Sequence, residues 1–178
     1  MNTALRNEPL IKNLMALGVA MPTTGALIAG ALVDPTAVVG AVTQNTDNLL
    51  NSVSLDDEFL AQPKSGFLAM AFGTTAANGN TKDIKMFLGT DVIANFIDST
   101  ASGKDWQLVA LVIRVSADVQ IGFAWTVIDG AMTAATSINI AGTQDENIAQ
   151  TIKTTGNNNS AAASAATGKG LVVLPFRG

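Results

Sequence analysis

The chain has 178 residues, only 13% of them charged, and a formal net charge of −4. It contains no cysteine, histidine or tyrosine, which excludes disulfides, thiolate metal sites and catalysis by Ser-His-Asp or Cys-His arrangements. The acidic balance argues against nucleic-acid binding, which needs a basic surface. We therefore expect no nucleic-acid partner.

Residues 1–45 lack the alternating pattern of a β-strand. Within them, Ala4–Leu17 could form a short helix with leucines near one face. Ala26–Val42 is apolar, rich in small residues and broken at Asp34-Pro35, and its pattern fits extended chain or an additional strand equally well. The longest uninterrupted apolar run, Gly25–Val33, is shorter than the ~20 residues that span a bilayer, so we expect no membrane partner.

From Asp47 onward the pattern is mostly that of β-structure. Eight segments show alternation or β-branched residues between turn-like borders. They are Leu50–Leu55, Gly66–Thr74, Thr81–Leu88, Asp105–Ser116, Val119–Ile128, Ser137–Ile140, Ile148–Thr155 and Gly170–Phe176. This spacing predicts an all-β fold, an antiparallel β-sandwich of jelly-roll type with about eight strands, in residues 46–178. Residues 1–45 are then an N-terminal arm or anchoring segment.

Three connections between these strands carry recognisable turn signals. Asn78-Gly79-Asn80 predicts a hairpin between its two flanking strands, because Asn and Gly tolerate positive φ. Ala117-Asp118 predicts a tight turn between the two longest strands. The low-complexity stretch 155–168 is too small and polar to pack a core, and predicts a long exposed hairpin connection to the last strand.

The two long central strands differ in how their apolar residues are distributed. The strand at 105–116 is apolar on both faces, so we expect its outer face to be covered by the N-terminal region or by a neighbouring subunit. In the strand at 119–128 bulky apolar residues alternate with small or polar ones, which predicts a core face and a milder outer face. The expected core face consists of Val119, Ile121, Phe123, Trp125 and Val127. Trp106 and Trp125 are accordingly expected in the core, the alternative being a platform for carbohydrate.

Few groups of residues suggest chemistry. Asp56-Asp57-Glu58 could bind a hard cation, but it lacks the Asp-x-Asp-x-Asp-Gly spacing of such loops and favours a solvated turn. Asp129 with Asp145-Glu146 could supply the carboxylate pair of a glycoside-cleaving enzyme, although the chain has few aromatic residues to line a sugar groove.

The glycines at positions 73, 79 and 89 lack the lysine and the strand-to-helix context of a phosphate-binding loop. They are typical of turn and bulge positions. We therefore predict no catalytic, cofactor-binding or metal-binding residue, and no cofactor.

Four parts of the chain, taken in order, resemble one protein family. Asn48–Leu55 is similar to its opening strand, Gly73–Thr90 to its "GTFAANANNK" turn with the following "LKLYFGGT" strand, and Trp106–Arg114 to its tryptophan-containing strand. Thr151–Gly156, with the Asn/Ala-rich loop and Leu171–Leu174, resembles its closing hairpin. The family is a recurrent group of bacteriophage virion proteins built on a jelly-roll β-sandwich, and the resemblance extends from about Thr46 to Pro175.

The resemblance implies a structural virion component rather than an enzyme. It implies a capsid decoration (cement) protein on the exterior of the head, commonly a homotrimer, with the major capsid protein as its partner. The N-terminal segment would then bind the shell or a neighbouring subunit. The alternative is a head- or tail-fibre module that binds a host receptor or glycan through loops such as Ser99–Lys104 or Asn157–Thr167.

Overall fold

The computed structural model describes residues 32–35, 38–39, 47–56, 60, 64–98, 102–141, 149–158 and 166–176. The chain divides into two compact units, Met1–Ala31 and Leu32–Gly178, and all described residues belong to the second. The predicted helix at Ala4–Leu17 lies outside them.

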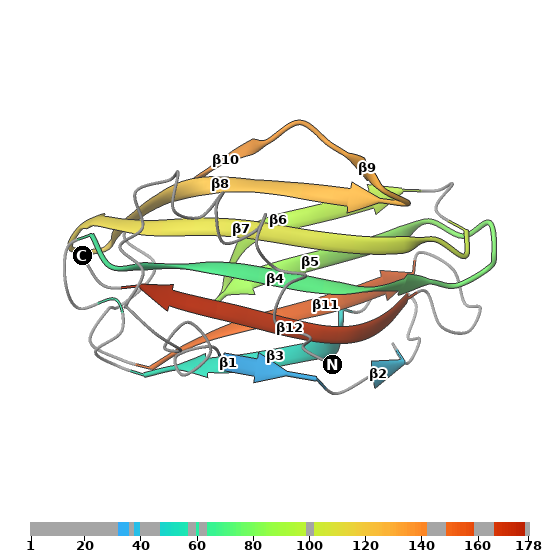
Figure 1. Cartoon of the computed structure of the whole chain (residues 1–178), viewed down its shortest axis with the longest axis horizontal. Coiled ribbons are helices and arrows are strands. Elements are labelled where there is room, and N and C mark those ends of the chain that lie inside the picture. The colour runs from blue at the N-terminus through green and yellow to red at the C-terminus, as the bar shows by residue number, and fades with distance from the viewer. Residues whose placement is uncertain are drawn as a thin grey trace, which may run out of the picture. The chain divides into compact units, whose positions relative to one another are not determined.

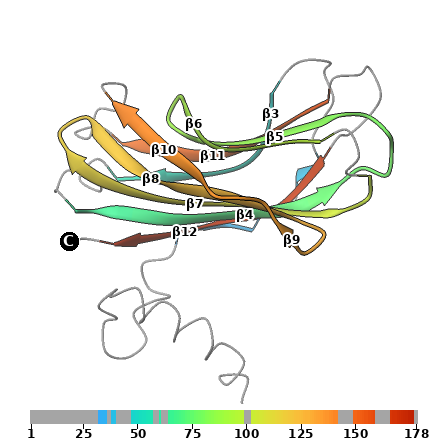
Figure 2. The ribbon, with the colours of Figure 1, turned by 90° about the horizontal axis from the view of Figure 1, so that it is seen from above.

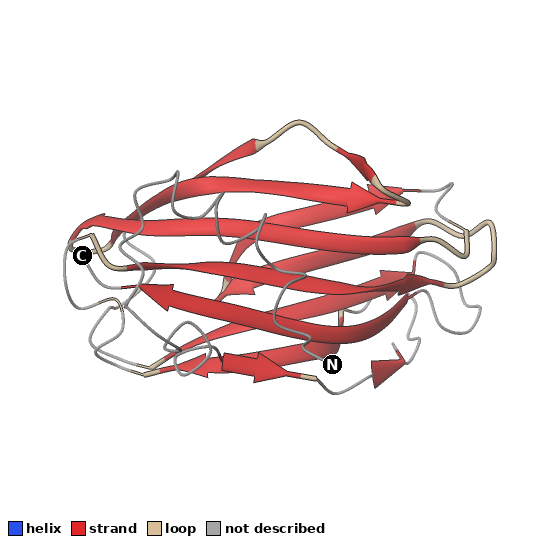
Figure 3. Cartoon of the chain, in the orientation of Figure 1, coloured by secondary structure: helices blue, strands red, loops and turns tan. Residues whose placement is uncertain are grey.

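The described part of the chain forms two antiparallel sheets that face each other (Figures 1 and 2). Sheet A runs in the order β1 (Leu32–Asp34), β12 (Ala166–Phe176), β4 (Gly66–Thr75), β7 (Asp105–Ser116), β8 (Val119–Ile128) and β10 (Thr136–Ala141), with β2 (Val38–Val39) beside β12 and β9 (Ala131–Met132) beside β8. Sheet B runs in the order β3 (Asn48–Leu55), β11 (Gln150–Asn158), β5 (Lys82–Leu88) and β6 (Asp91–Asp98). Every described element is a strand (Figure 3), and the all-β sandwich expected from the sequence is confirmed.

All eight predicted strands are present, β7 and β8 with the predicted bounds. The structure adds β6 and three short strands, β1, β2 and β9. Within Ala26–Val42, the described residues 32–34 and 38–39 fit the strand interpretation, since β1 and β2 both pair with β12. Residues 32–34 and 38–39 thus contribute to sheet A, while the anchoring role of the N-terminal segment stays a prediction.

Two predicted hairpins are wrong, because their strands lie in different sheets. β4 belongs to sheet A and β5 to sheet B, so Asn78-Gly79-Asn80 lies in a connection between the layers. Its residues have no positive φ; instead the Asn80 amide donates to Asn78 Oδ1 at 3.2 Å. The connection from Ala76 to Thr81 is long enough to cross the ~10 Å between stacked sheets, which a two-residue hairpin turn is not. β11 and β12 likewise lie in sheets B and A, so the last connection is no hairpin either.

The tight hairpins are found where the backbone does adopt positive φ. Ala117-Asp118 joins β7 to β8 with Asp118 at φ 55°, which confirms the predicted turn. Gly89 (φ 58°) turns β5 into β6, and Asp129 and Gly130 (φ 51° and 81°) turn β8 into β9. Turns of this kind match the right-handed twist of the strands they join.

The core lies between the sheets and is built by strict alternation. β7 turns Trp106, Leu108, Ala110 and Val112 inward, and all four are buried. The predicted apolar face of β5 meets them from sheet B, with Ile84, Met86 and Leu88 fully buried.

The two long sides of the sandwich are constructed differently. On one side β1 lies against β3, and the Ser52 amide of β3 donates to Asp34 Oδ2 at 3.0 Å, which links the sheets. On the other side β10 and β6 are the last described strands of their sheets. A groove of about 220 Å³ lies there, lined by residues of both strands and of β8.

Candidate interaction surface

The core-facing and outward-facing residues of β8 are the reverse of those predicted from its sequence. Its small and polar residues face the core, where Gln120, Ala124 and Thr126 are buried. Ile121 and Phe123 point away from sheet B and are 46% and 54% exposed. The reason lies in the opposite sheet: β6 packs against β7 and β8 and fills the layer with its own buried Ile93, Ala94 and Phe96.

The outward side chains of sheet A form continuous apolar rows. The strand registers align Trp125 of β8, Val109 of β7, Met70 of β4, Val172 of β12 and Val33 of β1 in a single row. The neighbouring row consists of Phe123, Leu111, Leu68 and Leu174. We call these nine residues the apolar face. It contains no charged side chain, although it crosses the central strands of the larger sheet.

Aromatic rings cover the backbone at the two borders of the apolar face. The Phe176 ring lies over Gly66 on the adjacent strand, with Cζ 2.6 Å from the point where a Cβ would stand. The Phe72 ring lies over Gly170 in the same way, with Cζ at 2.8 Å. Rings placed across cross-strand glycines extend the apolar surface beyond the two rows.

Large apolar residues remain accessible on this side of sheet A. Val33 is 53% exposed, and Phe72 is also exposed. Single exposed apolar residues are ordinary, but contiguous apolar patches mark interaction sites. The expectation that the outer face of β7 is covered by another surface therefore extends to β4, β8 and β12.

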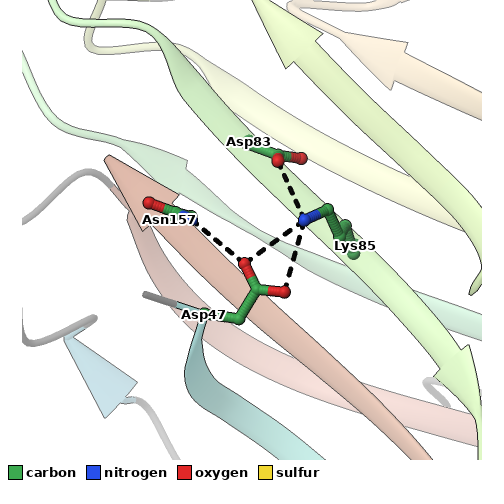
Figure 4. A network of polar contacts seen from close by, with 4 residues as sticks. All are labelled: Asp47, Asp83, Lys85 and Asn157. Carbon is green, nitrogen blue, oxygen red and sulfur yellow. Dashed lines mark hydrogen bonds and ion pairs between the residues drawn. The ribbon is translucent and has the colours of Figure 1, made fainter. Parts of the chain in front are cut away.

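The outer side of sheet B carries a network of polar contacts (Figure 4) beside the exposed apolar residues Leu49, Val92 and Ile97. Lys85 Nζ contacts both carboxylate oxygens of Asp47 at 3.3 Å and Asp83 Oδ2 at 3.0 Å. Asn157 Nδ2 donates to Asp47 Oδ1 at 3.2 Å. These contacts tie the residue before β3 to β5 and β11.

The Asp83 hydrogen bond, and then that of Asp47, raise the pKa of Lys85 against the opposing effect of burial. Close by, Lys153 Nζ lies 5.2 Å from the centre of the Phe87 ring. A face with paired charges is compatible with water. The apolar face of sheet A differs in that its apolar side chains follow one another across neighbouring strands, which makes it the stronger candidate for an interaction surface.

The groove between β6 and β10 is a second candidate. Its lining is uncharged and consists of Val92, Ile93, Ala94, Asn95, Ala124, Trp125, Thr126, Thr133, Thr136, Ser137, Ile138, Asn139 and Ile140. At about 220 Å³ it is smaller than the ~300–1,000 Å³ of typical ligand pockets. It can accept one or two side chains or a small polar group.

The structure describes only two of the acidic residues considered for chemistry. Asp56 is exposed at the end of β3, and Asp129 is exposed in the β8–β9 turn. Asp57, Glu58, Asp145 and Glu146 lie outside the described residues. Within the described ranges, no group of three acidic side chains is placed to hold a metal ion.

The two tryptophans have different surroundings. Trp106 is 1% exposed in the core, as predicted, whereas Trp125 is half-buried on the outer side of sheet A and also borders the groove. Gly73 lies within β4 and Gly89 in a turn, in keeping with structural roles. The apolar face had a signal in the sequence, the two-sided hydrophobicity of β7.

In the described ranges no helix reaches the length and hydropathy that crossing a membrane requires.

Comparison with known proteins finds no family model and no curated protein that matches this chain. Among solved structures, that of infectious bursal disease virus Gt strain is similar to this chain at 8% sequence identity and a TM-score of 0.35. The similarity covers 83% of this chain and 32% of the viral chain. The VP2 subviral particle of the same virus is similar at 12% identity and a TM-score of 0.23, over 83% and 41%. The chain spans less than half the length of these proteins. Structural similarity at these TM-scores assigns no function to the chain.

Proposed function

We propose that this chain is a structural protein of a bacteriophage virion, a capsid decoration protein that stabilises the head from its exterior. The observation that carries the proposal is the apolar face, nine residues in register without a charge. The sequence segments that resemble phage virion proteins support it, as does the β-sandwich that contains them. The role is structural rather than catalytic.

The stabilising effect would come from burial of the apolar face against a neighbouring subunit. Two outward rows across up to five strands ~4.8 Å apart span about four residues of each strand and present roughly 300 Å². Each partner in a standard interface contributes about 800 Å², so the apolar face would form the central part of a larger interface. Burial at about 25 cal/mol per Å², less the cost of association, would favour the bound state. The major capsid protein and further copies in a homotrimer are the proposed partners.

The test is binding of the purified chain to phage heads that lack it. Phe123→Lys places a charge in the apolar face, and we expect it to weaken binding by about tenfold or more, because a buried unpaired charge is costly. Ile97→Lys on sheet B is the matched control, since Ile97 is 59% exposed and Phe123 is 54% exposed. Equal binding of the two variants would contradict the proposal.

The N-terminal segment can be tested separately. Because residues 32–39 include strands of sheet A, the informative truncation removes residues 1–31 and leaves β1 in place. If the truncated chain binds heads as well as the full chain, the anchoring role fails while the role of the apolar face stands.

A fibre module that binds a glycan is the second candidate, and one observation favours it. Trp125 is among the residues that line the groove, with Thr133, Ser137 and Asn139, and an aromatic residue beside hydroxyl and amide residues suits a sugar ring. Retention on host polysaccharide that Trp125→Ala abolishes would support this role. A virion reconstruction separates the two candidates, since it would place the chain on the capsid lattice or at a fibre.

A further inference from the structure

Among the described strands, β10 differs from the other outermost strands of the two sheets. Its sequence, from Thr136 to Ala141, contains no charged residue, proline or glycine. It pairs with β8 through six consecutive positions without a bulge. An uncharged, regular edge strand is a template for pairing with another strand, and proteins commonly protect such edges.

The remaining described edges are short or protected. β2 and β9 have two residues each, and β1 has three and is followed by Pro35. β3 is closed by the hydrogen bond from Ser52 to Asp34. β6 has a register shift against β5 and an aspartate at each end, Asp91 and Asp98. Antiparallel pairing of two β6 strands would bring acidic ends of both copies together, which is unfavourable.

We propose that β10 pairs with β10 of a second copy of this chain, antiparallel and about a two-fold axis at Asn139, so that sheet A continues from one copy into the other. The strand that pairs with this edge is β10 of a second copy, because antiparallel pairing of two β10 strands places apolar residues opposite apolar ones and polar or small residues opposite each other. An antiparallel pair puts directly opposed side chains on the same face, and a two-fold contact repeats every pairing.

The alternation of β10 selects the register. Ile138 and Ile140 face inward and are 7% and 5% exposed, whereas Ser137 and Asn139 are exposed. With the axis at Asn139, Ile138 lies opposite Ile140 of the second copy, and Ile140 opposite its Ile138. Asn139 then faces its own equivalent, and Ser137 faces Ala141. This register pairs five residues of each strand and makes both apolar cross-strand contacts, and no charge opposes another.

The groove gives this pairing a further consequence. Ile138 and Ile140 both line it, so the isoleucines of the second strand would extend its apolar wall. The contact is separate from the apolar face, and it concerns the isolated chain in solution. It can therefore fail without affecting the proposed role in the virion, and the reverse also holds.

The experiment uses the absence of native cysteine. Directly opposed Cβ atoms in an antiparallel pair lie ~4.5–5.5 Å apart, close enough for a disulfide after slight adjustment. Asn139→Cys in the full chain should therefore form a disulfide-linked dimer under mild oxidation. Ser137→Cys, on the same strand and face, is the control and should react about tenfold more slowly, because it opposes Ala141. Ser137→Cys combined with Ala141→Cys should restore rapid cross-linking.

Sedimentation of the unmodified chain over a range of concentrations provides the second measurement. Asn139→Lys, which opposes two ammonium groups across the axis, should weaken self-association about tenfold. Ile97→Lys on β6 should not, since Ile97 is exposed and does not line the groove. Equal cross-linking rates for Asn139→Cys and Ser137→Cys would overturn the proposal, as would self-association that Asn139→Lys leaves unchanged. Thermal melts of each variant establish that it is folded.

Discussion

Trp106 of β7 lies directly opposite Gly73 of β4, and its indole ring covers the glycine on the core side of sheet A. The ring carbon Cζ2 is 2.6 Å from the point where a Cβ of residue 73 would stand, and the Thr167 carbonyl is closer still. The largest side chain of the core thus depends on the smallest residue beside it. Close approach of a ring or backbone is one of the reasons for glycine within a strand.

Gly73→Ala should destabilise the fold by about 2–3 kcal/mol, because the added methyl group displaces either the indole or the β12 backbone. Denaturant unfolding followed by tryptophan fluorescence measures the change. Gly79→Ala is the control, since no atom beyond its two chain neighbours lies within 4 Å of the point where its methyl group would stand, and it should change stability by less than about 0.5 kcal/mol. Similar losses for the two variants would contradict the packing described.

Single-tryptophan variants test the orientation of β8. Trp125→Phe leaves the buried Trp106, and its emission should be blue-shifted and weakly quenched by acrylamide. Trp106→Phe leaves the outward Trp125, whose emission should be red-shifted and readily quenched. If Trp125 proved the better protected of the two, the assignment of the β8 faces would be wrong.

Gln120→Met should leave the fold as stable or make it more stable by about 1–2 kcal/mol. Gln120 is fully buried, and neither Oε1 nor Nε2 has a hydrogen-bond partner in the described structure. Methionine has a similar shape without the unpaired polar atoms. The exposed Gln107 of β7 offers the same substitution as a control with little expected change, and a clear loss of stability for Gln120→Met would show that its amide is paired.

Lys85→Met should cost about 0.5–1 kcal/mol near neutral pH, since the pair with Asp47 and Asp83 is partly exposed to solvent. The pKa of Lys85 is raised above 10.5 in the folded chain, so its contribution is complete below the unfolded-state pKa. It is lost as the pH rises above 10.5 through the folded-state pKa. The stability difference from the unmodified chain should accordingly shrink in that range. Lys169→Met, which breaks a more exposed pair with Asp105 at 3.6 Å, should have little effect at any pH.

Asp34→Ala should weaken the link between β1 of sheet A and β3 of sheet B. The amide of Ser52 loses its acceptor, and its hydrogen exchange should accelerate by about tenfold, equivalent to ~1.4 kcal/mol. Asp34→Asn retains an acceptor oxygen and should preserve most of the protection. Unchanged exchange at Ser52 in the alanine variant would mean that β1 does not hold β3.

Much of the fold could be predicted because alternation is a local property. The bounds of β7 and β8, the turn at Ala117-Asp118 and the apolar face of β5 follow from neighbouring residues alone. β6 escaped prediction because its register shift against β5 breaks the alternation: Ile93 and Ala94 are adjacent in sequence and both are buried.

The errors concern information that is not local. A turn signal such as Asn78-Gly79-Asn80 indicates that the chain bends but not whether it returns to the same sheet. The face of β8 was reversed because hydrophobicity alone does not distinguish a residue buried in the core from one on an interaction surface. Phe123 satisfies the pattern of a core residue and is exposed. The apolar face was therefore only partly predictable, from the two-sided hydrophobicity of β7.

The position of β12 between β1 and β4 has a consequence for synthesis. β1, near residue 32, and β4, which begins at residue 66, both pair with a strand that starts at residue 166. Sheet A therefore cannot close until β12 has emerged from the ribosome, and the rows of the apolar face cannot align before then. Non-local pairing of this kind folds slowly. Assembly through this sheet can accordingly begin only after β12 has been added to it.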